Sequence, residues 1–396
     1  MNSMIKNYLL GEYSMKVNNR LDSLSEYHFQ RLDEIKKKLL ISGKTLLDLS
    51  IGDPDLPVEN NIIDGLIRGL GIEDYNKYPP YSGVDGLKNS IIKYYNDVYS
   101  VKLDVNEVLI LIGSKEGLNN VIPALCSIGD YALVPKLAYP VYETCCRLWG
   151  VKTFKFELEE KNNYLPELLN IPDEILEKSK FMMLNYPNNP TGAVANESFY
   201  KDALKFCSKK NIVVINDGAY NEILKPGEKP LSILQVDSKK QCIEFGTFSK
   251  IYNMTGFRIG YAVGNRDIIK ALLKIKSNVD SGQFIPIQYA AIEALKLSRK
   301  YVDDIRKVYL ERKVLTEKLL SKHNIDFYKS EGTFYVWCKV PKNYTTESFC
   351  EELLNDFGIV VTPGTAFGEC GKGYFRIALT KDKYEIDKIM SNLRCY

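Results

Sequence analysis

The stretch G-T-F-S-K-I-Y-N-M-T-G-F-R-I-G, residues 246–260, decides how the rest of this chain is interpreted. Lys250 stands just after two hydroxyls, Thr247 and Ser249, and Arg258 follows in the same glycine-bounded run. A lysine amine can bond to an aldehyde, and hydroxyls and a guanidinium can hold a phosphate through charge-assisted hydrogen bonds. The stretch therefore indicates a lysine bonded to a small aldehyde that carries a phosphate. For this stretch alone, the alternatives are a surface lysine in a phosphate-binding loop and a simple polar turn.

Length and charge set the class of protein. The 396 residues suffice for two domains, each with its own core. Because 53 basic and 50 acidic residues leave a net charge of +3, we expect neither nucleic acid nor a membrane surface as a partner. No apolar run approaches the ~20 residues of a membrane-spanning helix, and residues 1–14 lack the features of a signal peptide. We therefore expect a cytoplasmic protein.

Cysteine and histidine usage argues against a metal centre. The nine cysteines are scattered without a C-x-x-C pair, and the chain has two histidines. A zinc site or a histidine-based catalytic triad is therefore not expected. The chemistry must come from lysine, tyrosine, aspartate or a cofactor.

Predicted strands and helices alternate over residues 108–263. Short apolar runs bounded by turn residues predict the strands, and helical apolar spacing predicts the intervening helices. The predicted strands are Val108–Ile112, Tyr131–Val134, Thr153–Glu157, Phe181–Leu184, Ile212–Ile215, Cys242–Gly246 and Ile259–Val263, and the predicted helices include residues 85–99, 141–149 and 197–209. The alternation favours an α/β fold with a mostly parallel sheet covered by helices, whose ligands bind beyond the carboxyl ends of the strands.

The pattern changes after Arg266, where long helical stretches give way to short strands. Helices are predicted over residues 267–277, 286–322 and 383–393, and strands over 325–328, 333–338 and 374–379; a further helix is predicted over 21–40. We interpret residues 1–14 as an extension, 60–285 as a large domain, and 15–59 together with 286–396 as a small α+β domain.

Three polar loops follow predicted strands: G-S-K-E-G (113–117), N-Y-P-N-N-P-T-G (185–192) and N-D-G-A-Y (216–220). A strand, a glycine and a helix N-terminus form an anion site, so Ser114 and the backbone around Lys115 could share the phosphate with Thr247, Ser249 and Arg258. This turn alone is a weak signal, because many α/β proteins contain several.

An aromatic aldehyde phosphate would give each remaining loop residue a role. Asp217 could keep a pyridine nitrogen protonated, which makes the ring an electron sink. Tyr220 and Asn189 could bond the ring's 3′ oxygen, and Tyr139 could stack on the ring face. The alternatives are a helix cap or turn for Asp217, loop hydrogen bonds for Tyr220 and Asn189, and a core position for Tyr139.

Arg376 is a lone charge in the apolar run Y-F-R-I-A-L. A buried arginine needs a partner, and a substrate carboxylate bound by both guanidinium nitrogens would be a suitable one. An internal salt bridge is the alternative. Gly52, after the apolar run T-L-L-D-L-S-I, would allow the backbone to approach a ligand closely, or it would serve a simple turn.

Six motifs in this order resemble the pyridoxal-phosphate-dependent aminotransferases of fold type I, class I/II, over residue 15 to the C-terminus. They are G-S-K-E-G, A-Y-P, Y-P-N-N-P-T-G, D-G-A-Y, F-S-K-x-x-N-M-T-G-F-R-I-G and F-R-I-A. Within the class the chain is most similar to the LL-diaminopimelate aminotransferase group. The segments that carry this likeness are V-N-N-R-L-x-x-L-x-x-Y-x-F, L-S-I-G-D-P-D-L-P, Y-P-P-Y-S-G-V-D-G-L and S-N-V-D-S-G-Q-F-x-P-I-Q.

The resemblance implies a seven-stranded, mostly parallel sheet with a small domain, pyridoxal 5′-phosphate as cofactor, and a homodimer with an active site shared across the interface. Lys250 would be the Schiff-base lysine and the acid/base for the substrate Cα proton, with Asp217 and Tyr220 as its catalytic partners. Tyr78 would reach the partner's phosphate. The implied substrate-binding residues are Tyr27, Gly52, Lys115, Tyr139, Asn189 and Arg376.

Three positions depart from the family pattern. Ile251 and Phe257 stand where a polar residue and tryptophan are more frequent, and Tyr289 stands where a smaller or acidic residue is expected. These departures bear on the identity of the substrate rather than on the reaction class.

The resemblance therefore predicts an aminotransferase that moves an amino group from an amino acid to a 2-oxoacid. We expect LL-diaminopimelate as donor and 2-oxoglutarate as acceptor, with aspartate or a broad range of neutral and aromatic amino acids as the alternative. A lyase that uses the same cofactor is a second hypothesis. A sensor domain of a transcription regulator is a third, although residues 1–14 are too short for a DNA-binding module.

Overall fold

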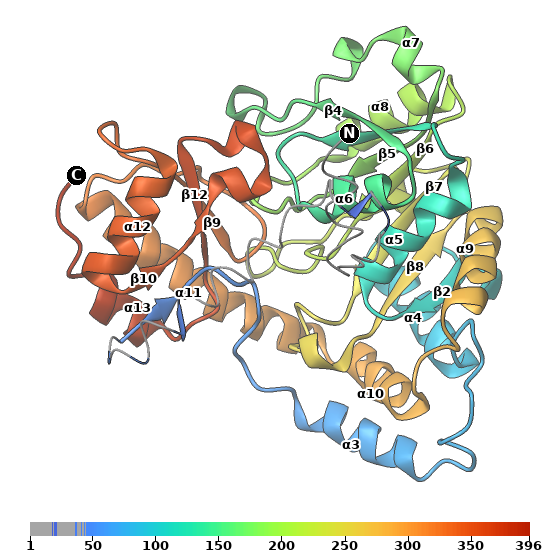
Figure 1. Cartoon of the computed structure of the whole chain (residues 1–396). Helices are drawn as coiled ribbons and strands as arrows, with labels where there is room; N and C mark the ends of the chain where they lie inside the picture. Colours follow the sequence, from blue (N-terminus) through green and yellow to red (C-terminus); the bar gives the residue numbers. More distant parts are fainter. Residues whose placement is uncertain (1–17, 19, 22–35, 38–40, 42, 44) are drawn as a thin grey trace, which may run out of the picture.

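The computed structural model describes residues 18, 20, 21, 36, 37, 41, 43 and 45–396 (Figure 1). The extension over residues 1–14, Tyr27 and most of the helix predicted over 21–40 lie outside the described residues. None of the described helices is both long and apolar enough to cross a membrane.

Seven of the described strands form one sheet in the order β2-β8-β7-β6-β5-β3-β4. All neighbouring pairs are parallel except those of β8, which runs antiparallel to both β2 and β7. The strands are β2 (Val108–Leu111), β3 (Tyr131–Pro135), β4 (Lys152–Phe156), β5 (Ser179–Leu184), β6 (Val213–Asp217), β7 (Cys242–Thr247) and β8 (Gly260–Gly264). The predicted mostly parallel α/β sheet is therefore confirmed.

Helices cover both faces of this sheet because its strands are apolar on both sides. One face carries a core that includes Leu111, Ile215 and Phe245, and the other a core that includes Met182 and Val214. The covering helices are α5 (Ser114–Leu125), α6 (Val141–Leu148), α7 (Asp173–Leu176), α8 (Glu197–Ser208) and α9 (Arg266–Val279). Central parallel strands read as continuous apolar runs when both faces are buried, which is why V-L-I-L and F-M-M-L were recognisable in the sequence.

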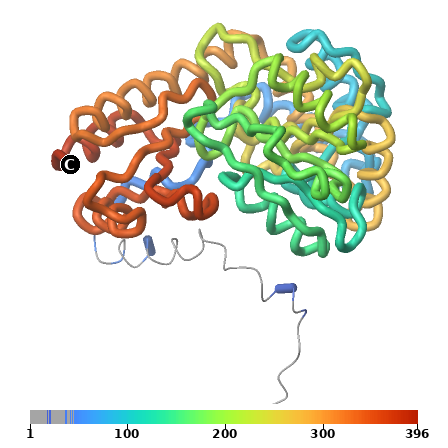
Figure 2. The backbone as a smooth tube through the Cα atoms, turned by 90° about the horizontal axis from the view of Figure 1, so that it is seen from above, coloured from blue at the N-terminus to red at the C-terminus, as the bar shows by residue number. Residues whose placement is uncertain are grey.

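A smaller antiparallel sheet lies beside the large one, in the part of the chain coloured orange and red in Figure 2. Its order is β11-β12-β9, with β9 (Tyr335–Lys339), β11 (Thr362–Pro363) and β12 (Tyr374–Ala378). Helices α11 (Arg299–Lys322), α12 (Thr346–Phe357) and α13 (Lys383–Met390) belong to the same part. The short strand β1 (Leu47–Asp48) pairs in parallel with β10 (Ile359–Val360), so this early segment packs against the C-terminal part of the chain.

Three more helices pack against one another. α3 (Asn60–Leu70) packs along α10 (Ile285–Lys296), and α10 also packs on α4 (Asp85–Tyr99) (Figure 1). The division into domains stays a prediction.

Two sequence predictions for the C-terminal region are wrong. The helix over residues 286–322 is two helices, because Leu297 and Ser298 are extended and the Ser298 side chain caps α11 by accepting from the Tyr301 N–H. The strand over residues 325–328 is reduced to one bridge between Phe327 and Cys338, because Ile325 instead bonds back to the end of α11 at Leu320.

Candidate active site

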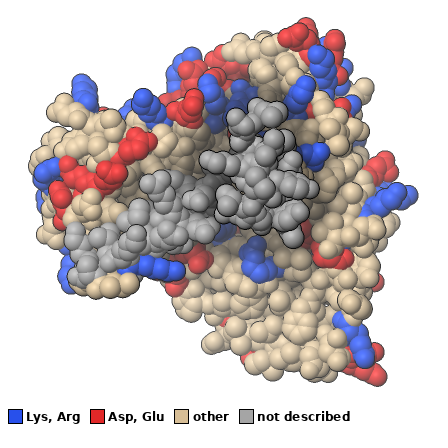
Figure 3. Space-filling model, viewed as in Figure 1, with Lys and Arg blue, Asp and Glu red and all other residues tan. Residues whose placement is uncertain are grey.

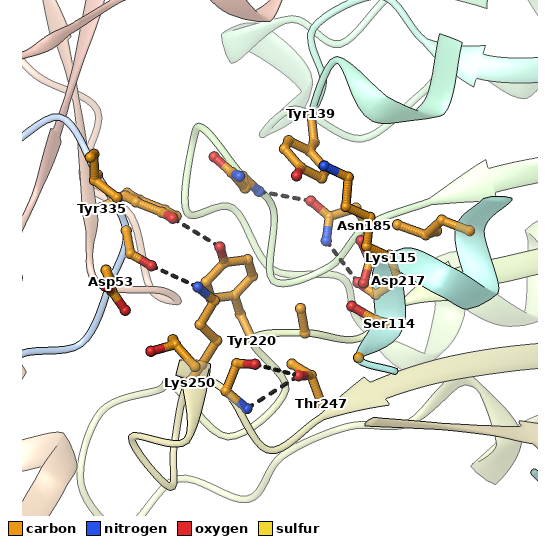
Figure 4. A pocket seen from close by; sticks show the side chains of 18 of the residues that line it. Asp53, Ser114, Lys115, Tyr139, Asn185, Asp217, Tyr220, Thr247, Lys250 and Tyr335 are labelled. Atoms are coloured by element: carbon orange, nitrogen blue, oxygen red, sulfur yellow. Dashed lines mark hydrogen bonds between the residues drawn. The ribbon is translucent and has the colours of Figure 1, made fainter. Parts of the chain in front are cut away.

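A cavity of about 470 Å³ opens at the carboxyl ends of the parallel strands, where the small sheet approaches the large one (Figure 4). Loops after β2, β3, β5, β6 and β7 supply most of its wall, and β9, β12 and the segment after β1 supply the rest. The sequence-predicted residues that line it are Gly52, Ser114, Lys115, Tyr139, Asn189, Asp217, Tyr220, Thr247, Ser249, Lys250, Arg258 and Arg376. Segments distant in the sequence therefore meet at one site.

Lys250 projects into the cavity from the loop after β7. Its Nζ donates to the Gly52 carbonyl at 2.6 Å and lies 6.0 Å from the centre of the Tyr220 ring. Burial lowers the pKa of Lys250 to about 8; Asp53 opposes this shift, and Arg376 and Arg258 add to it. A lysine with this pKa is partly neutral near neutral pH, and a neutral amine is the form that attacks a carbonyl.

Asp217 ends β6 and is buried beneath the cavity. The Tyr142 hydroxyl donates to its Oδ2 at 2.8 Å, whereas its Oδ1 has no hydrogen-bond partner among the described residues. Burial raises the pKa of Asp217 to about 6, and the bonds from Tyr142 and the Ala219 backbone oppose that rise. A buried carboxylate oxygen without a donor is costly unless a ligand supplies one, so Oδ1 is suited to a protonated ring nitrogen.

One corner of the cavity gathers groups that bind anions. Thr247 Oγ1 donates to Ser249 Oγ at 2.9 Å, and the Ser249 N–H donates to Thr247 Oγ1 at 3.1 Å. The helix α5 begins at Ser114, after Gly113 at φ 73°, so its N-terminus points its positive end at the cavity. A Cβ on residue 113 would lie 2.9 Å from Arg258 Nη2, so glycine lets the guanidinium approach the turn.

Arg376 lies in β12 and is 3% exposed. Its Nη1 donates to Asn189 Oδ1 at 2.7 Å and its Nη2 to the Ser50 carbonyl at 2.6 Å, while its Nε has no partner among the described residues. Within that part of the chain its partners are all neutral, so the alternative of an internal salt bridge is not observed there. A buried guanidinium without a counter-ion beside a cavity is suited to a ligand carboxylate.

One predicted residue that the structure describes is not in the cavity wall: Tyr78 is 81% exposed and does not line it. Tyr27 lies outside the described residues. The three departures from the family pattern, Ile251, Phe257 and Tyr289, are likewise not among the lining residues.

The wall also contains residues that the sequence analysis did not single out. Tyr142 lies three residues after Tyr139, and Asn185 opens the loop N-Y-P-N-N-P-T-G, so both stood beside recognised positions. Asn185 Nδ2 donates to the Asp217 carbonyl at 2.7 Å. Tyr335 had no local signal, because its cavity contacts come from segments far away in the chain; its hydroxyl lies 2.8 Å from that of Tyr220.

Comparison with known proteins places this site in a family. The pattern that defines Aminotransferase class I and II matches residues 44–393. An LL-diaminopimelate aminotransferase from Aquifex aeolicus is 43% identical over 364 residues, which is 91% of this chain and 94% of that protein. One of the same name from Natranaerobius thermophilus is 42% identical over 96% of this chain and 99% of that protein.

A solved structure agrees in shape. The substrate-bound BacF structure from Bacillus subtilis superimposes with a TM-score of 0.92 at 33% identity, covering 96% of this chain and 97% of that one. The chain therefore belongs to the class I and II aminotransferases and is a pyridoxal-phosphate-dependent transaminase.

Proposed function

We propose that this aminotransferase removes an amino group from LL-diaminopimelate and passes it to 2-oxoglutarate. The observation that carries the proposal is the identity of 43% and 42% to two relatives with that name, over more than nine-tenths of the chain. The cavity is compatible with such a substrate, because LL-diaminopimelate has two carboxylates and the wall holds two cationic side chains besides Lys250 and Arg258, namely Arg376 and Lys115.

The residues present fit pyridoxal phosphate. In the cavity, Asp217 could bind the ring nitrogen of the cofactor and Tyr220 its 3′ oxygen. Lys250 could bond its aldehyde, and the anion-binding groups around Ser114 could hold its phosphate. The unpartnered Asp217 Oδ1 is the most telling match, because a protonated ring nitrogen would satisfy it. When bound, the cofactor supplies a ring that withdraws electrons from the substrate Cα.

We assign Lys250 two tasks. Its amine, with a pKa of about 8, would hold the cofactor through the aldehyde. The same amine, when free, would be the acid/base group that accepts and returns the proton of the substrate Cα. Burial suits both tasks, because it keeps the amine partly neutral and away from bulk water.

The other residues hold the two ligands. Asp217 keeps the ring nitrogen protonated, Tyr220 and Asn189 bond the 3′ oxygen, and Tyr139 covers the ring face. Ser114, Thr247, Ser249, Arg258 and the backbone at Lys115 bind the phosphate. Arg376 and Gly52 bind the substrate α-carboxylate, and Tyr27 and Lys115, with Tyr139 and Asn189, line the remainder of the substrate site.

We further propose that two copies form a homodimer and that Tyr78 contacts the phosphate in the partner's site. Exposed apolar side chains gather on and near α3: Ile67, Leu70, Tyr75, Tyr78 and Phe284, with the Tyr75 and Phe284 rings in edge contact at 6.3 Å. The surface over α3 and α10 in Figure 3 is largely uncharged. Exposed apolar patches commonly mark protein interfaces. A cytoplasmic role in amino-acid biosynthesis completes the proposal.

A donor screen tests the substrate. Purified enzyme with pyridoxal phosphate and 2-oxoglutarate is offered LL-diaminopimelate, aspartate, glutamate with another oxoacid, alanine and aromatic amino acids, and glutamate or oxoacid formation is measured. We expect the highest kcat/KM for LL-diaminopimelate. A higher value for aspartate or an aromatic donor would contradict the assignment. Parallel reactions without an acceptor detect a lyase, which would release ammonia and pyruvate.

A further inference from the structure

Tyr335 contacts both Tyr220, which is proposed to bond the cofactor, and Arg376, which is proposed to bind the substrate. It is the first residue of β9 and 2% exposed. Its hydroxyl lies 2.8 Å from the Tyr220 hydroxyl (Figure 4). The guanidinium carbon of Arg376 lies 4.0 Å from the centre of its ring. Arg376 pairs with Trp337 across the β12–β9 ladder, so Arg376 and Tyr335 are diagonal neighbours on one face of the small sheet.

Gly52 fixes the position of the Tyr335 hydroxyl from the other side. A Cβ on residue 52 would lie 1.9 Å from Tyr335 Oη, so the hydroxyl occupies the space of a side chain there. The Gly52 carbonyl accepts the hydrogen bond from Lys250 Nζ. The hydroxyl of Tyr335 is thus packed between the backbone that holds the lysine and the phenol of Tyr220.

We propose that Tyr335 is a positioning residue that donates its hydroxyl hydrogen to the Tyr220 oxygen and so directs the Tyr220 hydrogen to the 3′ oxygen of the cofactor, while its ring supports Arg376. This rests on the proposed function, in which Tyr220 bonds that oxygen. A phenol has one hydrogen to donate, so Tyr220 can serve the cofactor only if Tyr335 is the donor between them. Donation by Tyr335 also polarises Tyr220 and strengthens its own bond.

Removal of one oxygen atom isolates this role. Tyr335→Phe keeps the ring under Arg376 and leaves the charged groups around the two phenols in place. These groups are Arg376 on β12, Asp217 on β6, Lys250 and Arg258 on the loop after β7, and Asp53 after β1. The readout is the pKa of the visible absorbance of the bound cofactor, measured without substrate. We expect this pKa to rise by about 0.5 unit, because a weaker Tyr220 bond stabilises the negative 3′ oxygen less.

Tyr309→Phe is the matched control. Tyr309 packs on Phe334 at 5.0 Å between ring centres, Phe334 precedes Tyr335, and the Tyr309 hydroxyl has no partner among the described residues. The same loss of one hydroxyl should leave the cofactor pKa unchanged. If Tyr309→Phe shifted it equally, the effect of Tyr335→Phe would be one of packing and the proposal would fail.

The double variant with Tyr220→Phe tests whether Tyr335 acts through Tyr220. We expect Tyr335→Phe to add no further pKa shift in that background, since the two hydroxyls form one chain. An additional shift of the same size as in the parent would overturn the proposal, as would an unchanged pKa in Tyr335→Phe itself.

Gly52→Ala gives an independent approach should Tyr335→Phe unfold. The new methyl displaces the Tyr335 hydroxyl from Tyr220, so the cofactor pKa should shift in the same direction, and an unchanged pKa would contradict the inference. Failure of the proposed function is distinguishable, because it would be seen in the donor screen as a higher kcat/KM for another donor, whereas normal cofactor absorbance with unaltered pKa values in the variants contradicts the role of Tyr335 alone.

Discussion

Two ionic clusters, built around the buried carboxylates of Asp217 and Glu222, differ in how far their hydrogen bonds are satisfied. The Glu222 cluster comprises Glu222, Arg299 and Arg306. Glu222 bonds Arg299 at 2.5 Å and Arg306 at 2.8 Å. Arg306 also donates to the carbonyls of Glu222 at 2.8 Å and Glu228 at 2.9 Å.

The cavity cluster comprises Asp217, Lys250 and Arg376. Asp217 Oδ1 and Arg376 Nε have no partner among the described residues, and burial shifts the pKa of Asp217 up and that of Lys250 down. Fully paired buried charges fix one conformation. Incompletely paired ones with shifted pKa values mark a site that is completed by a ligand. We therefore expect the first cluster to serve the fold and the second to serve the chemistry.

Removal of the cavity lysine should have the largest effect. Lys250→Ala leaves the proposed site without its covalent anchor and its proton carrier, so we expect kcat for transamination to fall by ~10⁴-fold or more. The control is Lys383→Ala, whose exposed ammonium pairs with Glu311, and its kcat should equal that of the parent. Full activity in Lys250→Ala would refute the assignment.

Disruption of the Glu222 cluster should reduce stability instead. Glu222→Ala removes the carboxylate that pairs with Arg306 at 2.8 Å, and leaves this arginine, whose side chain is 1% exposed, with only the longer pair to Asp303 at 3.2 Å among the described residues. We expect the free energy of unfolding in urea to fall by about 3–5 kcal/mol, the usual cost of breaking a buried pair from one side. Glu311→Ala removes a surface carboxylate and should give no measurable change. Equal unfolding curves for the two variants would show that the Glu222 cluster has no structural role.

Asp217→Asn should stabilise the cofactor-free protein, with a defined pH dependence. Since burial raises the pKa of Asp217 from 3.8 to about 6, the folded state binds more protons than the unfolded state between these values. The stability of the parent therefore falls as pH rises from about 4 to 6 and stays lower above that window, whereas the asparagine side chain of the variant does not titrate. We expect the variant to be more stable at pH 8 by about 3 kcal/mol at most, and by little at pH 4.

Urea unfolding of the cofactor-free parent and variant at pH 4, 6 and 8 measures this difference. The expected change in the free energy of unfolding is opposite in sign to that for Glu222→Ala, because a buried carboxylate whose partner is a ligand destabilises the protein when the ligand is absent. A variant less stable than the parent at pH 8 would mean that Asp217 is as fully satisfied as Glu222.

Much of the architecture could be predicted from local sequence. The central strands are apolar on both faces, and the loops that follow them carry glycine, asparagine and aspartate at the ends where ligands bind, so Asp217, Lys250 and Ser114 were recognisable beforehand. The resemblance to a family added Tyr78 and Tyr27, and it gave Gly52 a role in substrate binding. The roles of all these residues stay predictions, although most of them line one cavity.

Features that depend on distant segments were not predictable. Tyr335 meets Tyr220 across 115 residues of sequence, and Asn189 meets Arg376 across 187. Neither pairing leaves a periodic or local signal. The break between α10 and α11 was missed because apolar residues continue at helical spacing on both sides of it, whereas Leu297 and Ser298 are extended and Ser298 caps the start of α11.

The covalent attachment of the cofactor tests the central claim most directly. Purified protein loaded with pyridoxal phosphate is reduced with borohydride, digested, and analysed by mass spectrometry, with Lys250→Ala treated identically. We predict that the reduced cofactor is found on the peptide that contains Lys250, and that the variant carries none at any specific site. Attachment to another lysine, or equal labelling of the variant, would contradict the assignment of this cavity as the active site.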